Sequence, residues 1–232
     1  MPRRKRGETS KGKCSFCGTL CGKSEMLEHL KTCEKRIAAN KDLWEKDAFH
    51  ILVEGLYLPQ YWLHIAVASD ATLKRVDQFL RGIWLECCGH LSRFIIGGVY
   101  YEAFQDEDDK IWAMGLGREA RDMEVRVDIV LSKGLSFIHE YDYGTPTRLR
   151  LEVVDEYKAL AKNQEIKILA RNEPPKLKCV VCGAPATRVC SQCKRGTWLC
   201  DKCAKNHECG EDSLLPVTNS PRVGVCGYCG PC

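Results

Sequence analysis

The sequence lacks several features that would place it in a familiar functional class. Its 232 residues contain no run of about 18 apolar residues, so we expect no segment that crosses a membrane. No apolar stretch follows the basic start MPRRKRGETSKGK, which argues against a secretory signal. No phosphate-binding P-loop, G-x-S-x-G motif or dinucleotide-binding fingerprint appears. Hydrophobic residues make up 44% and charged residues 28%, which is typical of a globular protein.

Cysteine, by contrast, is abundant. The chain has sixteen cysteines, and most of them occur in C-x-x-C pairs. Two cysteines separated by two residues suit a tight turn that directs both sulfurs at one metal ion. Because we expect no secretory signal, this pattern favours zinc over disulfides and a reducing, cytoplasmic location.

Positive charge is concentrated toward the two ends of the chain. Residues 1–49 carry 12 Lys and Arg against 7 Asp and Glu, residues 50–172 carry 15 against 19, and residues 173–232 carry 8 against 5. Basic ends are compatible with nucleic-acid binding, although the excess is small. We expect residues 1–13 to be a disordered basic tail.

Residues 14–36 have the ligand pattern of a C2HC-type zinc finger. The spacing is Cys14-x2-Cys17-x11-His29-x3-Cys33. Ser24 can cap a helix on which His29 and Cys33, four residues apart, share one face. A closed four-ligand site of this kind is structural rather than catalytic. Cys21 is either a replacement ligand or a spare thiol.

Residues 176–232 form a second cysteine-rich region. Its potential ligands come in four pairs, which are Cys179/Cys182, Cys190/Cys193, Cys200/Cys203 and His207/Cys209. Eight ligands fit two zinc ions, and we expect interleaved pairing, with the first and third pairs on one ion and the second and fourth on the other. With the N-terminal finger, this predicts about three zinc ions per chain.

Five further cysteines have a less definite pattern. Cys226 and Cys229 form another C-x-x-C near Cys232, and they bind a further metal, complete an existing site or serve a redox function. Cys87 and Cys88 are adjacent, and since adjacent cysteines suit one metal poorly we interpret them as buried hydrophobic residues.

We predict that the middle of the chain forms an α+β domain with a mixed sheet and that the zinc-stabilised modules flank it. We expect a helical connector over 37–49 and a helix after Asp70, with Gly82 weakening it late. The charged residues 105–110 predict a loop, and 125–134 fits a strand or a short helix. The expected strands are 49–58, 61–69, two within 90–104 around a Gly97–Gly98 turn, 135–143, 148–157 and 165–172.

Residues 50–172 resemble the plasmid pRiA4b ORF-3-like family. The resemblance rests on YWLHIAVASDATLKRVDQFL (61–80), GHLSRFIIGGVYY (89–101) and FIHEYDYGTPTRLRLEVV (137–154), above all on Tyr141-Asp142-Tyr143-Gly144, which looks like the family's YDFG motif. It implies an α+β fold, a family of undetermined activity and a link to mobile genetic elements. After this motif the family typically has Asp, Trp and His at alternating positions, and in this chain those positions are occupied by Thr145, Thr147 and Leu149.

The C-terminal region resembles MYND and HIT-type fingers, which mostly mediate protein contacts, although its His207-x-Cys209 spacing departs from both.

Three functional classes follow from these patterns. The leading hypothesis is a binding module or adaptor for a protein partner, and the alternative is a nucleic-acid-binding protein that uses the basic N-terminus and the finger. An enzyme acting through His90, His139 and Asp142 ranks well behind, because a turn aspartate and a strand-face histidine explain Asp142 and His139 more simply. The oligomeric state is not predicted.

Overall fold

The structure is a computed structural model that describes residues 10–40, 46–103, 120–160, 164–193 and 197–231. The chain divides into two compact units, which are described separately. The first comprises Met1–Phe79 and Leu91–Glu173, and the second comprises Leu80–His90 and Pro174–Cys232. Within the described ranges, no helix combines the length and apolar character needed to span a bilayer.

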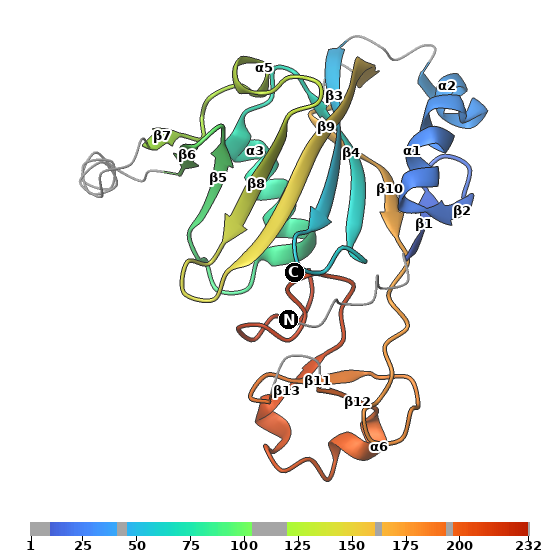
Figure 1. The fold of residues 1–232 in the computed structure, drawn as a ribbon, viewed down its shortest axis with the longest axis vertical. Helices are drawn as coiled ribbons and strands as arrows, with labels where there is room; N and C mark the ends of the chain where they lie inside the picture. The colour runs from blue at the N-terminus through green and yellow to red at the C-terminus, as the bar shows by residue number, and fades with distance from the viewer. Residues whose placement is uncertain (1–9, 41–45, 104–119, 161–163, 194–196, 232) are drawn as a thin grey trace, which may run out of the picture. The chain divides into compact units, whose positions relative to one another are not determined.

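A ten-stranded sheet dominates the first unit (Figure 1). Its strands in chain order are β1 (Lys11–Cys14), β2 (Leu20–Gly22), β3 (Lys46–Gly55), β4 (Trp62–Ala68), β5 (Ser92–Ile96), β6 (Val99–Glu102), β7 (Ala120–Asp122), β8 (Ser136–Tyr141), β9 (Thr147–Leu160) and β10 (Ile166–Asn172). They lie in the order β2-β1-β10-β4-β3-β9-β8-β5-β6-β7. The β6–β7 pair is parallel and the other pairs are antiparallel. This architecture confirms the predicted α+β class with a mixed sheet.

The main core lies between the sheet and helix α3 (Leu73–Leu80), which crosses one face of it (Figure 1). Strand β4 is buried along its whole length, as expected of a central strand that is covered on both faces. Helix α3 directs Leu73, Val76 and Leu80 inward at helical spacing, and all three are buried. The short helix α5 (Val127–Val130) completes this part of the unit.

The predicted elements of the central domain form with their ends shifted by a few residues. The expected strands correspond to β3, β4, β5, β6, β8, β9 and β10. The segment 125–134 contains the short helix α5, and α3 is followed directly by a π-helical turn, η1 (Arg81–Leu85). The loop expected over 105–110 lies outside the described residues.

Three expectations for the N-terminal region were wrong in detail. Helix α1 (Lys23–Thr32) begins after Gly22 rather than Ser24, because the Glu25 carboxylate accepts the Gly22 N–H at 2.9 Å. The connector helix expected over 37–49 is α2, which spans Glu34–Asn40, and strand β3 begins at Lys46. Residues 11–13, expected in the disordered tail, belong to β1 because they pair with β10.

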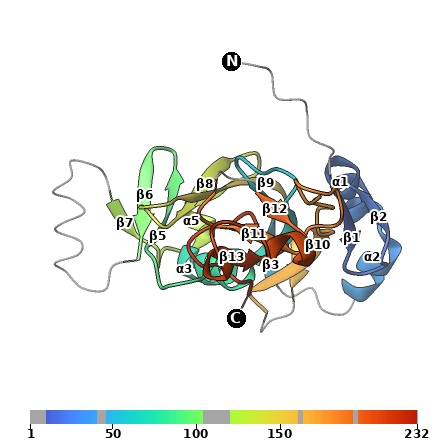
Figure 2. The same ribbon diagram turned by 90° about the horizontal axis from the view of Figure 1, so that it is seen from below.

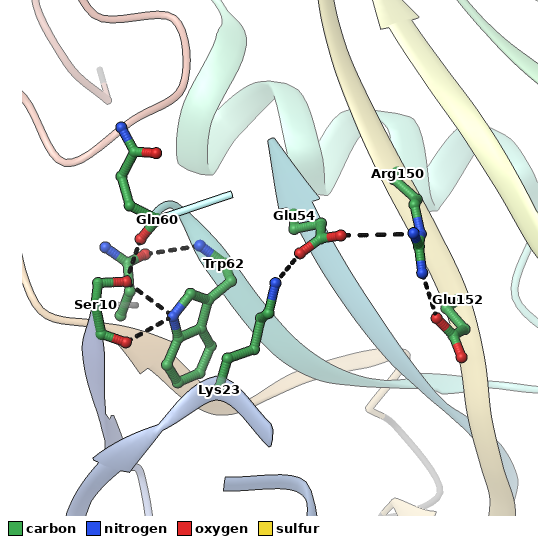
Figure 3. Close-up of polar contacts among 8 residues, drawn as sticks. Ser10, Lys23, Glu54, Gln60, Trp62, Arg150 and Glu152 are labelled. Carbon is green, nitrogen blue, oxygen red and sulfur yellow. Dashed lines mark hydrogen bonds and ion pairs between the residues drawn. The ribbon is translucent and has the colours of Figure 1, made fainter. Parts of the chain in front are cut away.

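The N-terminal module is built onto the sheet edge. Figure 2 shows α1 and α2 beside β1 and β2, at the opposite edge from β7. The Trp62 indole N–H donates to the hydroxyl oxygen of Ser10 at 2.9 Å, and Lys23 forms an ion pair with Glu54 (Figure 3). The backbone at Gly12 packs so closely on the Trp62 ring that an added Cβ would lie 2.2 Å from ring carbon Cη2.

We expect Gly12→Ala to destabilise the first unit by about 1–3 kcal/mol or more, as overpacking does. The new methyl group would also lie 2.6 Å from the backbone oxygen of Arg171, so moving the indole alone cannot relieve the clash. Urea unfolding followed by tryptophan fluorescence, with zinc held constant, measures the effect. Gly22→Ala in the same module is the control, because its Cβ meets only Glu25 Oε2 at 3.5 Å. Equal unfolding midpoints for the two variants would contradict the prediction.

The part of the second unit around helix α6 (Asp201–Ala204) has only a small apolar cluster, although Trp84, Leu85 and Tyr228 are buried elsewhere in this unit. The other elements of this unit beyond η1 are β11 (Arg188–Cys190), β12 (Trp198–Leu199), the 3-10 turn η2 (Glu211–Ser213) and β13 (Leu214–Pro216). The core around α6 consists of Cys179, Leu199 and Ala204, with Cys200, Cys203 and Leu214 packed against it. Half of these six residues are cysteines, so apolar burial alone supplies little folding energy here.

Candidate metal centres

The N-terminal module brings its four predicted ligands together. The donor atoms of Cys14, Cys17, His29 and Cys33 all lie within 4.8 Å of one another. Cys14 ends β1, and the following turn is closed by the Gly18 N–H, which donates to the Cys14 oxygen at 3.0 Å. His29 lies on α1, and Cys33 is the residue that caps it.

The thiols of this group differ in acidity. Hydrogen bonds from the side chain and backbone of Thr19 lower the pKa of Cys17 to about 6, whereas burial raises the pKa of Cys14 to about 11. Because a metal binds thiolates, its binding would displace the proton from Cys14. Cys21 lies outside the group, with its Sγ 3.8 Å from Met26 Sδ.

The C-terminal region contains two groups in the interleaved arrangement. One consists of Cys179, Cys182, Cys200 and Cys203, and the other of Cys190, Cys193, His207 and Cys209. Cys190 ends β11, which lies between β12 and β13 in the small sheet. A hydrogen bond between the Cys179 sulfur and the backbone of Cys200 is the main cause that lowers the pKa of Cys179 to about 6.

The distances within these groups fit a tetrahedral zinc ion. Zinc–sulfur bonds of about 2.3 Å and zinc–nitrogen bonds of about 2.0 Å place two ligand sulfurs about 3.8 Å apart and a sulfur and a nitrogen about 3.6 Å apart. The structure gives 3.6 Å for Cys182 Sγ to Cys200 Sγ and 3.5 Å for Cys193 Sγ to His207 Nε2. In the finger, Cys17 Sγ to His29 Nε2 is 3.2 Å. All fifteen described cysteines are free thiols.

A fourth group, which sequence reasoning missed, lies in the second unit. The donor atoms of Cys87, Cys88, His90 and Cys226 are within 4.8 Å of one another. The interpretation of Cys87 and Cys88 as buried hydrophobic residues was therefore wrong, since Cys87 is half-buried and Cys88 is exposed. Cys229 lies outside all four groups, and Cys232 lies outside the described residues. Two ligating segments about 140 residues apart leave no spacing signal in the sequence.

In the central domain, the candidate catalytic residues His139 and Asp142 make contacts that are internal to the fold. His139 on β8 is fully buried, and its Nε2 lies 2.7 Å from Asp77 Oδ1 on α3. Asp142 adopts a left-handed φ of 68° and accepts backbone N–H groups of Gly144 and Thr145 at 3.0 and 3.1 Å. The turn role of Asp142 and the strand-face position of His139 are thus confirmed, and neither offers a solvent-facing group to a substrate.

Comparison with known proteins assigns no family to the chain. No family model matches it, and no curated protein sequence does. The pRiA4b ORF-3-like resemblance therefore remains an interpretation of the sequence. Among solved structures, the chain is similar to a protein of unknown function, MM3350 from Methanosarcina mazei Go1. The similarity covers 54% of this chain and 68% of that one, with 12% identity and a TM-score of 0.43. Among the residues that the structure describes, four Cys/His groups could hold metal ions.

Proposed function

We propose that this protein is a zinc-stabilised binding module that recruits a protein partner through its C-terminal region. The observation that carries this proposal is a pair of exposed apolar residues on a ligand-bearing turn. Val180 and Val181 stand between Cys179 and Cys182 and are 60% and 70% exposed.

Zinc in these groups would be structural. Each group offers four protein ligands, which fill a tetrahedral coordination sphere and leave no position for a substrate or an activated water. The donor set of thiolates and imidazoles is the one that zinc prefers in structural sites. The two ions of the C-terminal region would then supply folding energy that the small apolar cluster around α6 does not provide.

Backbone hydrogen bonds fix the turn that carries Val180 and Val181. The Cys179 N–H donates to the Ala184 oxygen at 2.7 Å, and the Gly183 N–H donates back to the Cys179 oxygen at 2.9 Å. The Val180 N–H donates to the Trp198 oxygen at 2.9 Å. A rigid turn binds with little loss of conformational entropy, so exposed apolar side chains on it favour association with a protein.

The charge around this turn indicates the chemistry of the partner. Four exposed lysines, against one exposed carboxylate (Asp201), lie near this turn in the sequence or on the segment that bears Cys200 and Cys203, namely Lys176, Lys178, Lys202 and Lys205. An apolar centre with a positively charged rim complements a peptide segment whose apolar residues are flanked by Asp or Glu. We therefore propose an acidic–apolar peptide segment as the partner.

A phage-displayed library of random peptides, selected against the zinc-loaded full chain, tests this proposal. We expect enriched peptides to combine apolar residues with Asp or Glu. The double variant Val180→Asp/Val181→Asp should weaken binding of a selected peptide by about 30-fold or more, as loss of an interface hot spot does. Isothermal titration calorimetry measures the change.

Ile129→Asp is the matched control, because Ile129 is also β-branched and 70% exposed but lies on α5 in the first unit. Equal losses in both variants, or none in the valine variant, would overturn the proposal. Binding to a random-sequence RNA or DNA oligonucleotide that weakens steeply with salt, with no peptide enriched, would favour the nucleic-acid alternative.

A further inference from the structure

We infer that Cys87, Cys88, His90 and Cys226 form a fourth zinc site, which ties the C-terminal tail to the segment that follows η1. The inference extends beyond the proposed partner binding and does not depend on it. It raises the expected zinc content from about three ions to four per chain.

The geometry of this group matches that of the three groups with conventional spacing. All its donor atoms lie within 4.8 Å of one another, and His90 Nε2 is 3.1 Å from Cys226 Sγ. The donor set of three sulfurs and one imidazole is the same as in the N-terminal finger and in one of the two C-terminal groups. This set is typical of structural zinc.

A glycine turn explains how adjacent cysteines and a nearby histidine can converge. Gly89 adopts a left-handed φ of 71°, which reverses the chain between Cys88 and His90. The Glu86 carboxylate accepts the Gly89 N–H at 2.7 Å, and Arg81 forms an ion pair with the same carboxylate. The turn is therefore fixed by contacts that are independent of any metal.

A buried arginine lies beside one of the sulfur ligands of this site. Arg222 is fully buried, and its guanidinium donates to Cys87 Sγ at 3.4 Å. Burial of a positive charge is costly unless negative charge lies nearby. Three thiolates around one Zn²⁺ leave a net charge of −1 on the site, which a neighbouring guanidinium offsets.

The tail is also positioned for ligation by contacts next to the site. The Ser220 hydroxyl donates to the Trp84 oxygen at 2.6 Å and accepts the Arg222 N–H at 2.9 Å. These bonds hold residues 220–222 against the end of η1 and place Cys226 beside Cys88, whose Sγ is 3.9 Å from the Cys226 oxygen. Ligation of Cys226 would close a loop from residue 90 to residue 226.

The zinc content of the full chain tests the inference. We expect native mass spectrometry and elemental analysis to give four zinc ions for the unmodified protein and three for Cys226→Ser. Cys229→Ser is the control, because Cys229 is an exposed thiol in the same C-x-x-C pair but belongs to no group. It should retain four ions.

Thiol alkylation of the folded wild-type chain provides a second measurement that needs no variant. We expect Cys87, Cys88 and Cys226 to resist alkylation until a chelator is added, while Cys229 reacts at once. Three zinc ions in the wild type, with Cys88 and Cys226 as reactive as Cys229, would overturn the inference. A disulfide between Cys226 and any other cysteine would also overturn it.

Discussion

Cys182→Ser is expected to unfold the module that contains β11, β12 and β13 and to remove one zinc ion per chain. Cys182 is an exposed thiol, so its replacement costs almost no apolar burial. Any large effect must therefore arise from the lost ligand. The apparent binding free energy of structural zinc is about 10–16 kcal/mol in finger peptides, which exceeds the stability of most small domains.

Hydrogen exchange with mass spectrometry measures this effect by region. Amides such as those of Val180, Thr187 and Cys190, which donate to backbone oxygens inside the module, should lose most of their protection. Amides of the central strands β3, β4 and β9 should keep theirs, because the sheet has an apolar core of its own. Native mass spectrometry gives the zinc count in parallel.

Cys229→Ser serves as the control here also, since it removes an exposed thiol of the second unit without removing a ligand. It should leave both the zinc count and the exchange pattern unchanged. If Cys182→Ser retained full zinc content and full protection, the claim that metal holds this module together would be untenable.

Acidification is expected to destabilise the sheet through a buried pair of histidines. His50 on β3 and His64 on β4 lie in adjacent strands, with His50 Nε2 2.9 Å from His64 Nδ1. One ring donates its N–H to an unprotonated nitrogen of the other. Burial is the main cause that lowers the pKa of His50 to about 2 and that of His64 to about 4, below the ordinary 6.5.

The charged groups around the pair reinforce this effect. Positive charges on Arg36 and Lys31 lower the pKa of His50 further, whereas for His64 a hydrogen bond to the Lys23 backbone raises the pKa and the Lys23 charge lowers it, with burial as the largest cause. Tyr157 contributes a ring that packs edge-on against His50. No carboxylate appears among the charged groups that shift the pKa of either histidine.

The sign of the pH dependence follows from proton uptake on unfolding. Below pH 6.5 the unfolded chain protonates both histidines and the folded chain does not, so the free energy of unfolding falls with pH. Above pH 6.5 the contribution of the pair is constant. The slope reaches about 1.4 kcal/mol per pH unit for each histidine well below pH 6.5, so the loss between pH 6.5 and 5 is about 3 kcal/mol for the pair.

Urea unfolding of the wild type and of His50→Gln/His64→Gln across this pH range tests the expectation. Acid also releases zinc from its ligands, but it does so in both chains, so the difference in slope isolates the pair. If the variant does not fold, NMR titration of the imidazoles in the wild type gives the same information. Titration of either ring near pH 6.5 would contradict the prediction.

Local patterns in the sequence carried most of the information about the metal groups with regular spacing. The C-x-x-C pairs, and the four-residue interval from His29 to Cys33, specify turns and a helix face whatever the rest of the chain does. The order of the C-terminal pairs likewise indicated which cysteines share an ion. The alternation of apolar and polar residues predicted most strands of the sheet. In β9, for example, Leu149, Leu151 and Val153 are buried.

Short-range periodicity was enough to predict most strands of the sheet, helix α3 and the residues of three Cys/His groups. Two further features emerge only in the folded chain, namely the pairing of β1 with β10 and the convergence of Cys87, Cys88 and His90 with Cys226. Both join segments more than 130 residues apart, and nothing in local spacing encodes such a contact. Each arises only when segments far apart in the sequence have folded together, so Cys87 and Cys88 could not be predicted as ligands from the sequence around them.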